Sequence, residues 1–150
     1  MSKRALWFCL ACVLLAGCAA MEPRIERKAK KLDCESGNEC TVTIDVSCSR
    51  FYGCTLALDH DLILVKGRGK RTDITWQLAG ESGAEFPANG IVVDSAEFEC
   101  KPNPEKKKAF GCSDKHADFG VSKYTINVTL PSTAFGPRGV PSLDPWIVND

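Results

Sequence analysis

The residues of this chain that could do chemistry are few: two histidines, nine cysteines and one run of three lysines. His60 stands in the triplet Asp59-His60-Asp61. A carboxylate beside an imidazole can raise its pKa or share a metal ion with it. On a turn between short strands, the same residues are more often solvated. Metal binding by this triplet, with His116 as a further ligand, is therefore only an alternative interpretation.

Signatures of catalysis are missing from the sequence. There is no G-x-S-x-G, and a catalytic triad would need one of only two histidines. The segment 67–72 has the sequence GRGKRT, without the G-x4-G-K-[ST] spacing of a phosphate-binding loop. This segment is better interpreted as a basic hairpin turn. We expect no catalytic residue, no cofactor and no enzymatic activity.

Six cysteines follow residue 30, an even number, which favours disulfides. Their first four are spaced C-x5-C-x7-C-x5-C, unlike the C-x2-4-C spacing of structural zinc sites. The turn-forming segments ESGNE and SRFYG each lie between two of them and can bring these close together. We therefore expect three local bridges. They are Cys34–Cys40, Cys48–Cys54 and Cys100–Cys112.

The segment between Cys100 and Cys112 has the sequence KPNPEKKKAFG and is the predicted binding surface. A bridge and two prolines would stiffen it, and pre-organisation lowers the entropic cost of binding. Its candidate binding residues are Lys106, Lys107 and Lys108. Such a loop could meet an anionic glycan or lipid, or enter the cleft of a hydrolase as an inhibitor. A plain solvated hairpin tip is the simpler alternative.

The elements that must position these residues are strands. Apolar and polar residues alternate along 40–48, 74–78 and 124–130, which is typical of half-buried strands. Short apolar runs at 55–58, 62–66, 91–93 and 96–100 add further strands, and turn residues separate them. Trp146, Ile147 and Val148 predict a short terminal strand docked on the domain. The predicted fold is an all-β, disulfide-stabilised, immunoglobulin-like β-sandwich, with a small β-barrel as the alternative.

The first residues resemble the leader of a bacterial lipoprotein precursor. Lys3 and Arg4 precede the apolar run 5–16, which is too short to span a bilayer. The run ends in Leu15-Ala16-Gly17-Cys18, which is similar to a lipobox. The resemblance implies that the leader is cut before Cys18 and that this cysteine is acylated, for example with palmitate. An ordinary secretory signal cut before Met21 is the alternative.

The resemblance also implies an address. In lipoproteins of Gram-negative bacteria, an aspartate after the cysteine retains the protein at the inner membrane, and Ala19 stands there instead. The expected location is the cell envelope, on the outer membrane facing the periplasm. We divide the chain into a signal peptide at 1–17, a charged tether at 18–33 and one domain at 34–150.

The balance of basic and acidic residues narrows the range of functions that we predict. The chain has 19 basic and 19 acidic residues, so nothing indicates nucleic-acid binding. We predict a lipoprotein with a non-catalytic binding or assembly role. Its partners would be membrane lipid, through acylated Cys18, and an envelope protein or glycan. An inhibitor acting through the Cys100–Cys112 loop and a metal-binding envelope protein are the alternatives.

Overall fold

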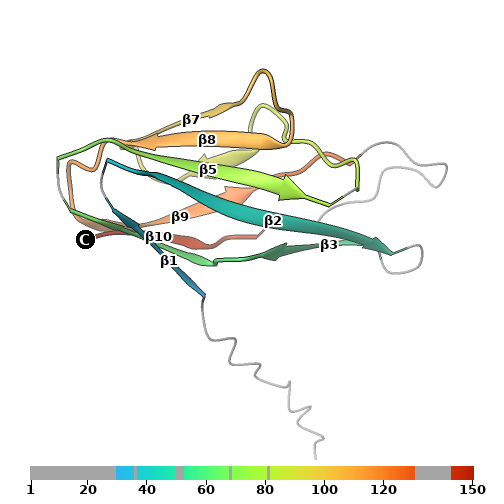
Figure 1. Ribbon diagram of the computed structural model, residues 1–150, viewed down its shortest axis with the longest axis horizontal. Coiled ribbons are helices and arrows are strands. Elements are labelled where there is room, and N and C mark those ends of the chain that lie inside the picture. The colour runs from blue at the N-terminus through green and yellow to red at the C-terminus, as the bar shows by residue number, and fades with distance from the viewer. Residues whose placement is uncertain (1–29, 36, 50–52, 68, 81, 131–142) are drawn as a thin grey trace, which may run out of the picture.

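A computed structural model describes residues 30–150 apart from 36, 50–52, 68, 81 and 131–142, so the lipobox lies outside the described residues. This part of the chain forms ten strands and no helix (Figure 1). No segment of it is a helix able to cross a membrane. The strands are β1 Lys31–Glu35, β2 Glu39–Ser49, β3 Gly53–Leu58, β4 Leu62–Lys66, β5 Thr72–Ala79, β6 Ile91–Val93, β7 Phe98–Pro102, β8 Ala109–Asp114, β9 Gly120–Ile126 and β10 Trp146–Asn149.

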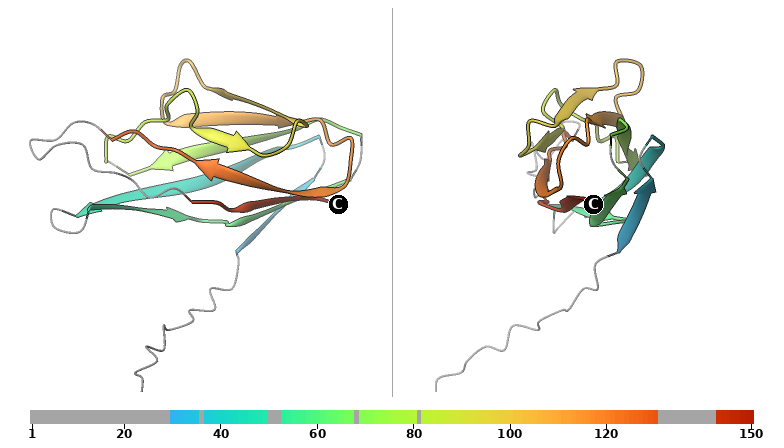
Figure 2. Two further views of the ribbon diagram at one scale, coloured as in Figure 1. Left: turned by 180° about the vertical axis from the view of Figure 1, so that it is seen from behind. Right: turned by 90° about the vertical axis from the view of Figure 1, so that its left-hand side faces the viewer.

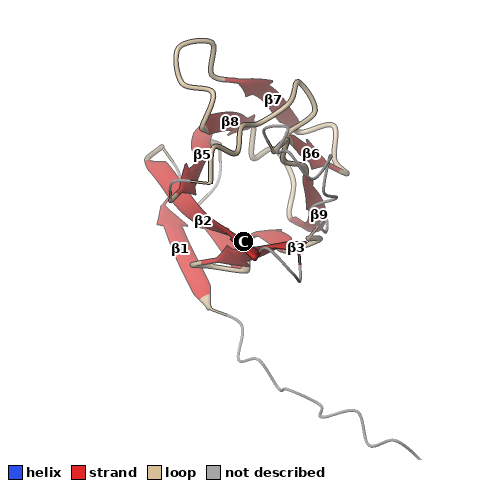
Figure 3. Cartoon of the chain, turned by 90° about the vertical axis from the view of Figure 1, so that its right-hand side faces the viewer, coloured by secondary structure: helices blue, strands red, loops and turns tan. Residues whose placement is uncertain are grey.

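The strands form two five-stranded sheets that face each other. Sheet A has the order β1-β4-β10-β9-β6, and sheet B has the order β3-β2-β5-β8-β7. Seen end on, the two sheets lie on either side of the core (Figure 3). Strand pairing does not join them into a closed barrel within the described residues. The predicted all-β sandwich is confirmed. Both sheets are mixed, because β1–β4, β4–β10 and β2–β5 are parallel pairs.

Most predicted strands are present, and the structure adds two that were not predicted, β1 and β8. Strand β1 begins at Lys31, inside the segment predicted as tether, because Leu32 and Cys34 face the core while β1 pairs with β4. The ordered fold therefore starts before the predicted boundary at residue 34. Strand β8 was not predicted at all. Strand β10 confirms the terminal strand that Trp146–Val148 predicted.

The strand predicted over 124–130 is wrong at its end. Strand β9 covers Gly120–Ile126, so it starts earlier and stops before Val128. Its partner β6 is only three residues long and pairs with it as far as Ile126. Beyond that point the Asn127 amide donates to the Gly90 carbonyl instead, over 2.7 Å. Beyond the strand, Thr129 forms an isolated antiparallel bridge with Glu85, so the alternating sequence pattern extends further than the continuous ladder.

The core lies between the sheets and is centred on two aromatic residues. Trp76 of β5 and Tyr124 of β9 are fully buried, and their ring centroids are 5.1 Å apart across the sandwich. Aromatic contacts of this kind add to the stabilisation from burial itself. Every inward position of β5 is buried, which explains why this strand alternates so regularly. The core therefore contains a direct aromatic contact between the two sheets.

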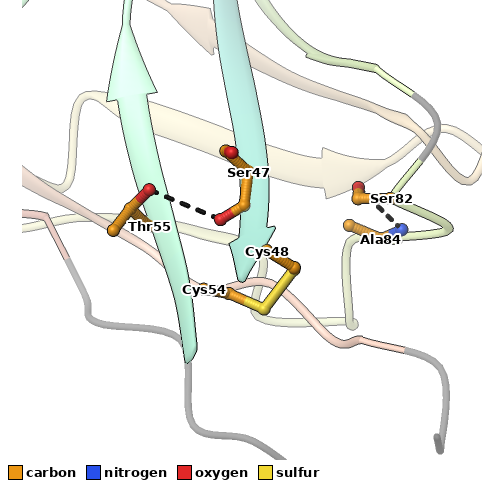
Figure 4. Close-up of a disulfide and its surroundings, with 6 residues drawn as sticks. All are labelled: Ser47, Cys48, Cys54, Thr55, Ser82 and Ala84. Atoms are coloured by element: carbon orange, nitrogen blue, oxygen red, sulfur yellow. Dashed lines mark hydrogen bonds between the residues drawn. A yellow bond between two sulfur atoms is a disulfide. The ribbon is translucent and has the colours of Figure 1, made fainter. Parts of the chain in front are cut away.

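The three disulfides join the predicted cysteine pairs, which confirms the predicted connectivity. Cys34–Cys40 links β1 of sheet A to β2 of sheet B and is buried. Cys48–Cys54 closes the β2–β3 hairpin, where Cys48 is exposed (Figure 4). The Thr55 hydroxyl of the same hairpin donates to the Ser47 carbonyl over 3.4 Å. One bridge therefore ties the sheets together, and two reinforce pairs within sheet B.

Candidate functional site

A groove of about 430 Å³ crosses the outer face of sheet B, over β5, β8 and β7. Its floor is β8, whose outward residues Ala109, Gly111 and Ser113 are all small. The strands on either side present longer side chains, so the outward face dips along β8. A Cβ added at Gly111 would meet no atom within 4 Å, which shows that the space above the floor is open.

Strand register fixes what lies on either side of the floor. Gly111 is flanked by Thr75 of β5 and Lys101 of β7. One row further along, Ser113 is flanked by Asp73 and Glu99. The groove is therefore bordered by hydrogen-bonding and charged groups of both signs, brought together by pairing between strands that are distant in sequence.

The charges at one end of the groove form a connected network. The Arg71 guanidinium donates to the Ser113 hydroxyl, which donates in turn to the Asp73 carboxylate over 2.7 Å. Arg71 also lies 3.7 Å from that carboxylate. The Lys115 ammonium lies 3.3 Å from Glu99. The Ser113 hydroxyl is therefore held between the Arg71 guanidinium and the Asp73 carboxylate.

Lys101 is the groove's distinctive cation. Its side chain is exposed and has no ion-pair or hydrogen-bond partner among the described residues. Pro102, Asn103 and Pro104 continue the same wall, and the Asn103 carbonyl side chain accepts the amide of Glu105 over 3.0 Å. The Cys100–Cys112 bridge holds the base of this wall to the floor. The wall is therefore a stiffened loop that carries a free positive charge.

The three predicted binding lysines lie beside this groove and do not line it. Lys107 lies 3.4 Å from Glu85, and the Lys108 ammonium donates to the Gly80 carbonyl over 2.9 Å. The backbone carbonyls of both residues accept amides of Phe86 and Leu78. Two of the three lysines thus fasten the loop to the segment after β5. The Lys106 side chain has no partner among the described residues, although its amide donates to the Asn103 side chain over 3.1 Å and its carbonyl accepts the amide of Ala109 over 2.8 Å.

The residues of the metal-binding alternative are not brought together. His60 lies 3.2 Å from Asp59 on the turn before β4, where the Asp61 carbonyl accepts the amide of Trp146 at the start of β10. His116 lies beside Asp114, which also interacts with the side chain of Asn149, at the other end of β10. Within the described ranges, no three histidine, cysteine or carboxylate side chains are arranged to hold a metal ion.

His116 instead belongs to a buried polar cluster. It is 1% exposed, has a positive φ of 46°, and neither ring nitrogen has a partner among the described residues. Its amide donates to the fully buried Asp114 carboxylate over 2.9 Å. Burial raises the pKa of Asp114, while this hydrogen bond opposes the rise. Asn149, also buried, lies near Glu97 of the same cluster.

Sequence reasoning missed the groove because it missed β8. The alternation of small residues at 109, 111 and 113 was the available signal, but small residues give little contrast in polarity. Arg71 lies in the segment 67–72, which was predicted as a basic hairpin turn, and Lys101–Pro104 lie in the predicted binding loop. The structure shows that these two regions border one groove.

Comparisons with known proteins add no family. No protein-family model matches this chain, and no curated protein matches it.

Proposed function

We propose that this protein is a lipid-anchored protein of the bacterial cell envelope that binds a partner protein without catalysing a reaction. The lipobox supports the anchor. The three disulfides support an oxidising compartment, because such bridges persist mainly in exported proteins. The expected location is the outer membrane, facing the periplasm.

The observation that favours a binding role is the groove on sheet B. It combines a rigid floor, a disulfide-stiffened wall and the free cation Lys101. The charges of both signs around it suit a protein segment, which can present complementary groups of both signs. No exposed aromatic ring of the described residues offers a stacking platform in the groove, and this favours a protein over a glycan.

Site-specific photocrosslinking tests the groove. A photoreactive residue in place of Thr75, which lines the groove on the side opposite Lys101, should form a discrete crosslink to one envelope protein in living cells. The matched control places the same residue at Ala57, which is exposed on the outer face of sheet B on β3. Equal crosslinking from both positions, or none from position 75, would refute the groove as the binding site.

The anchor has its own test. Cys18→Ser should abolish labelling by a radioactive or clickable fatty acid and should move the protein from the membrane fraction to the soluble fraction. The Cys48→Ser and Cys54→Ser double variant controls for the loss of a cysteine as such, and it should remain labelled. Membrane attachment that survives Cys18→Ser would overturn the lipoprotein assignment.

A further inference from the structure

The outer face of sheet A is apolar where a solvated face is expected to be polar. Strand register places Leu62 of β4 beside Trp146 of β10, and Leu64 beside Val148. Val121 of β9 lies beside Val148 in the same row. These positions alternate with the buried inward residues of the same strands. We call this surface the apolar stripe, and it consists of Leu62, Leu64, Val121, Trp146 and Val148.

Two members of the stripe are exposed, and the other three, Leu62, Leu64 and Val148, are half-buried. Val121 is 63% exposed and Trp146 is 43% exposed. Phe119, next to the start of β9, is 58% exposed. Single exposed apolar residues are common, but a contiguous set on one face indicates an interaction surface.

Lysines border the stripe on both sides. The Lys123 ammonium lies 4.6 Å from the centroid of the Trp146 ring. On the opposite side, Lys31 and Lys66 share the Asp33 carboxylate, at 2.9 Å and 3.1 Å. An indole with lysines around it is the combination that favours the interface between lipid headgroups and acyl chains. Because Asp33 offsets part of the positive charge, the attraction would come mainly from apolar contact.

The place where the chain enters the domain indicates which surface the apolar stripe contacts. Strand β1 is the edge strand of sheet A, and its first residue, Lys31, lies beside Leu62 in the same row as Trp146. Only residues 18–30 separate this point from the proposed anchor, so their reach is at most about 45 Å when fully extended. A tether of this length keeps the stripe at high effective concentration near the bilayer.

We propose that the apolar stripe docks on the surface of the bilayer that holds the anchor, with the Trp146 indole at the level of the lipid headgroups. This inference rests on the proposed lipid anchor. Docking by sheet A turns the outer face of sheet B, on the other side of the sandwich, away from the membrane (Figure 2). The groove then faces the periplasm, where a partner protein can reach it.

Tryptophan fluorescence gives a direct test, because Trp76 is fully buried and Trp146 is exposed. The acylated protein is inserted in vesicles of phosphatidylethanolamine and phosphatidylglycerol, with or without brominated acyl chains. We expect the brominated lipid to quench at least half of the Trp146 emission, and the vesicles to protect Trp146 from aqueous iodide. The acylated protein lacks the leader and with it Trp7, so the Trp146→Phe variant reports Trp76 alone, and its emission should not respond to either quencher.

A charged substitution in the stripe distinguishes docking of the stripe from anchoring through Cys18. Val121→Glu should stay in the membrane fraction but lose the quenching by brominated lipid and the protection from iodide. Ala57→Glu on sheet B is the matched control and should behave as the unmodified protein does. Both responses should change little between low and high salt, because apolar contact dominates.

Three results would overturn the proposal. The first is that Trp146 of the anchored protein remains fully accessible to iodide and is unaffected by brominated lipid. The second is that Val121→Glu leaves both responses intact. The third is that the lipid-free Cys18→Ser protein self-associates in sedimentation and that this self-association protects Trp146 from iodide, which would make a second copy of this chain the occupant. Loss of labelling in Cys18→Ser tests the anchor separately, so failure of the anchor and failure of docking are distinguishable.

Discussion

The two outer faces of this sandwich differ in chemistry although the same core supports both. Sheet B presents threonines and charged residues outward, such as Thr41, Asp45 and Thr75, and contains a groove. Sheet A presents the apolar stripe along β4, β10 and β9. A sheet that only needs to bury one side can keep the other side polar, as sheet B does. The apolar outward residues of sheet A are therefore the basis of the proposed docking, and the groove on sheet B is the basis of the proposed partner binding.

The largest effect is expected from Trp76, which lies in the core between the two sheets. Trp76→Ala removes the largest fully buried side chain, and it should lower the free energy of unfolding by about 3–5 kcal/mol. Because Trp76 packs on Tyr124 from the other sheet, both the groove crosslink and the docking of the stripe should weaken together. Urea unfolding measures the stability. Gln77→Ala, the half-buried neighbour on β5, is the control and should cost far less.

If Trp76→Ala left either face unimpaired, the two faces would not depend on a common core. A loss of stability below about 1 kcal/mol would likewise contradict the central role of this ring, since typical surface substitutions have effects of that size.

The next effect depends on pH and concerns Tyr124. Burial raises the pKa of Tyr124 to about 12, and the carboxylates of Asp59 and Asp61 add to the rise. In the unfolded chain Tyr124 loses its phenolic proton near pH 10, whereas in the folded state it keeps this proton up to about pH 12. The free energy of unfolding should therefore fall as the pH rises through this window, by roughly 2–3 kcal/mol.

Tyr124→Phe should remove this part of the alkaline destabilisation and leave stability below pH 10 nearly unchanged. Chemical denaturation of both proteins from pH 8 to 12 measures the difference. Equal slopes for the two proteins above pH 10 would show that Tyr124 ionises as readily in the fold as in the unfolded chain.

The sequence predicted the fold class, the disulfides and the strands with strong alternation, including β2, β5 and β10. These features depend on local patterns of polarity and spacing. It did not predict β8, because Ala109, Gly111 and Ser113 differ too little in polarity from the buried residues between them. It also could not place β2 parallel to β5, since that register depends on contacts between distant segments. The groove and the stripe both arise from such long-range pairing, so they appear only in the folded structure.

A smaller change in stability, with a selective change in binding, is expected at the groove floor. Gly111→Val adds a branched side chain where a Cβ meets open space, and valine suits a strand. Its stability should stay within about 1 kcal/mol of the unmodified protein. The side chain occupies the groove above its floor, so the crosslink from position 75 should fall at least tenfold while docking of the stripe persists. Val121→Glu should show the reverse, and parallel effects of the two variants would refute separate functions for the two faces.

The smallest effect is expected at the lysine run, where the structure sharpens the sequence hypothesis. If the run acts as one cationic surface, Lys106→Ser, Lys107→Ser and Lys108→Ser should weaken partner binding to similar degrees. The structure distinguishes these residues, because Lys107 pairs with Glu85 and Lys108 with the Gly80 carbonyl.

An exposed ion pair contributes only about 0–1 kcal/mol, so Lys107→Ser should shift the denaturation midpoint slightly and leave binding unchanged. Lys106→Ser should change neither property by more than a few tenths of a kcal/mol, whereas Lys101→Ser, on the groove wall, should reduce binding with little effect on stability. Denaturation of the four variants, and their crosslinking yield from the photoreactive residue at position 75, test this ranking. A larger loss of binding in Lys106→Ser than in Lys101→Ser would move the binding surface from the groove to the tip of the loop.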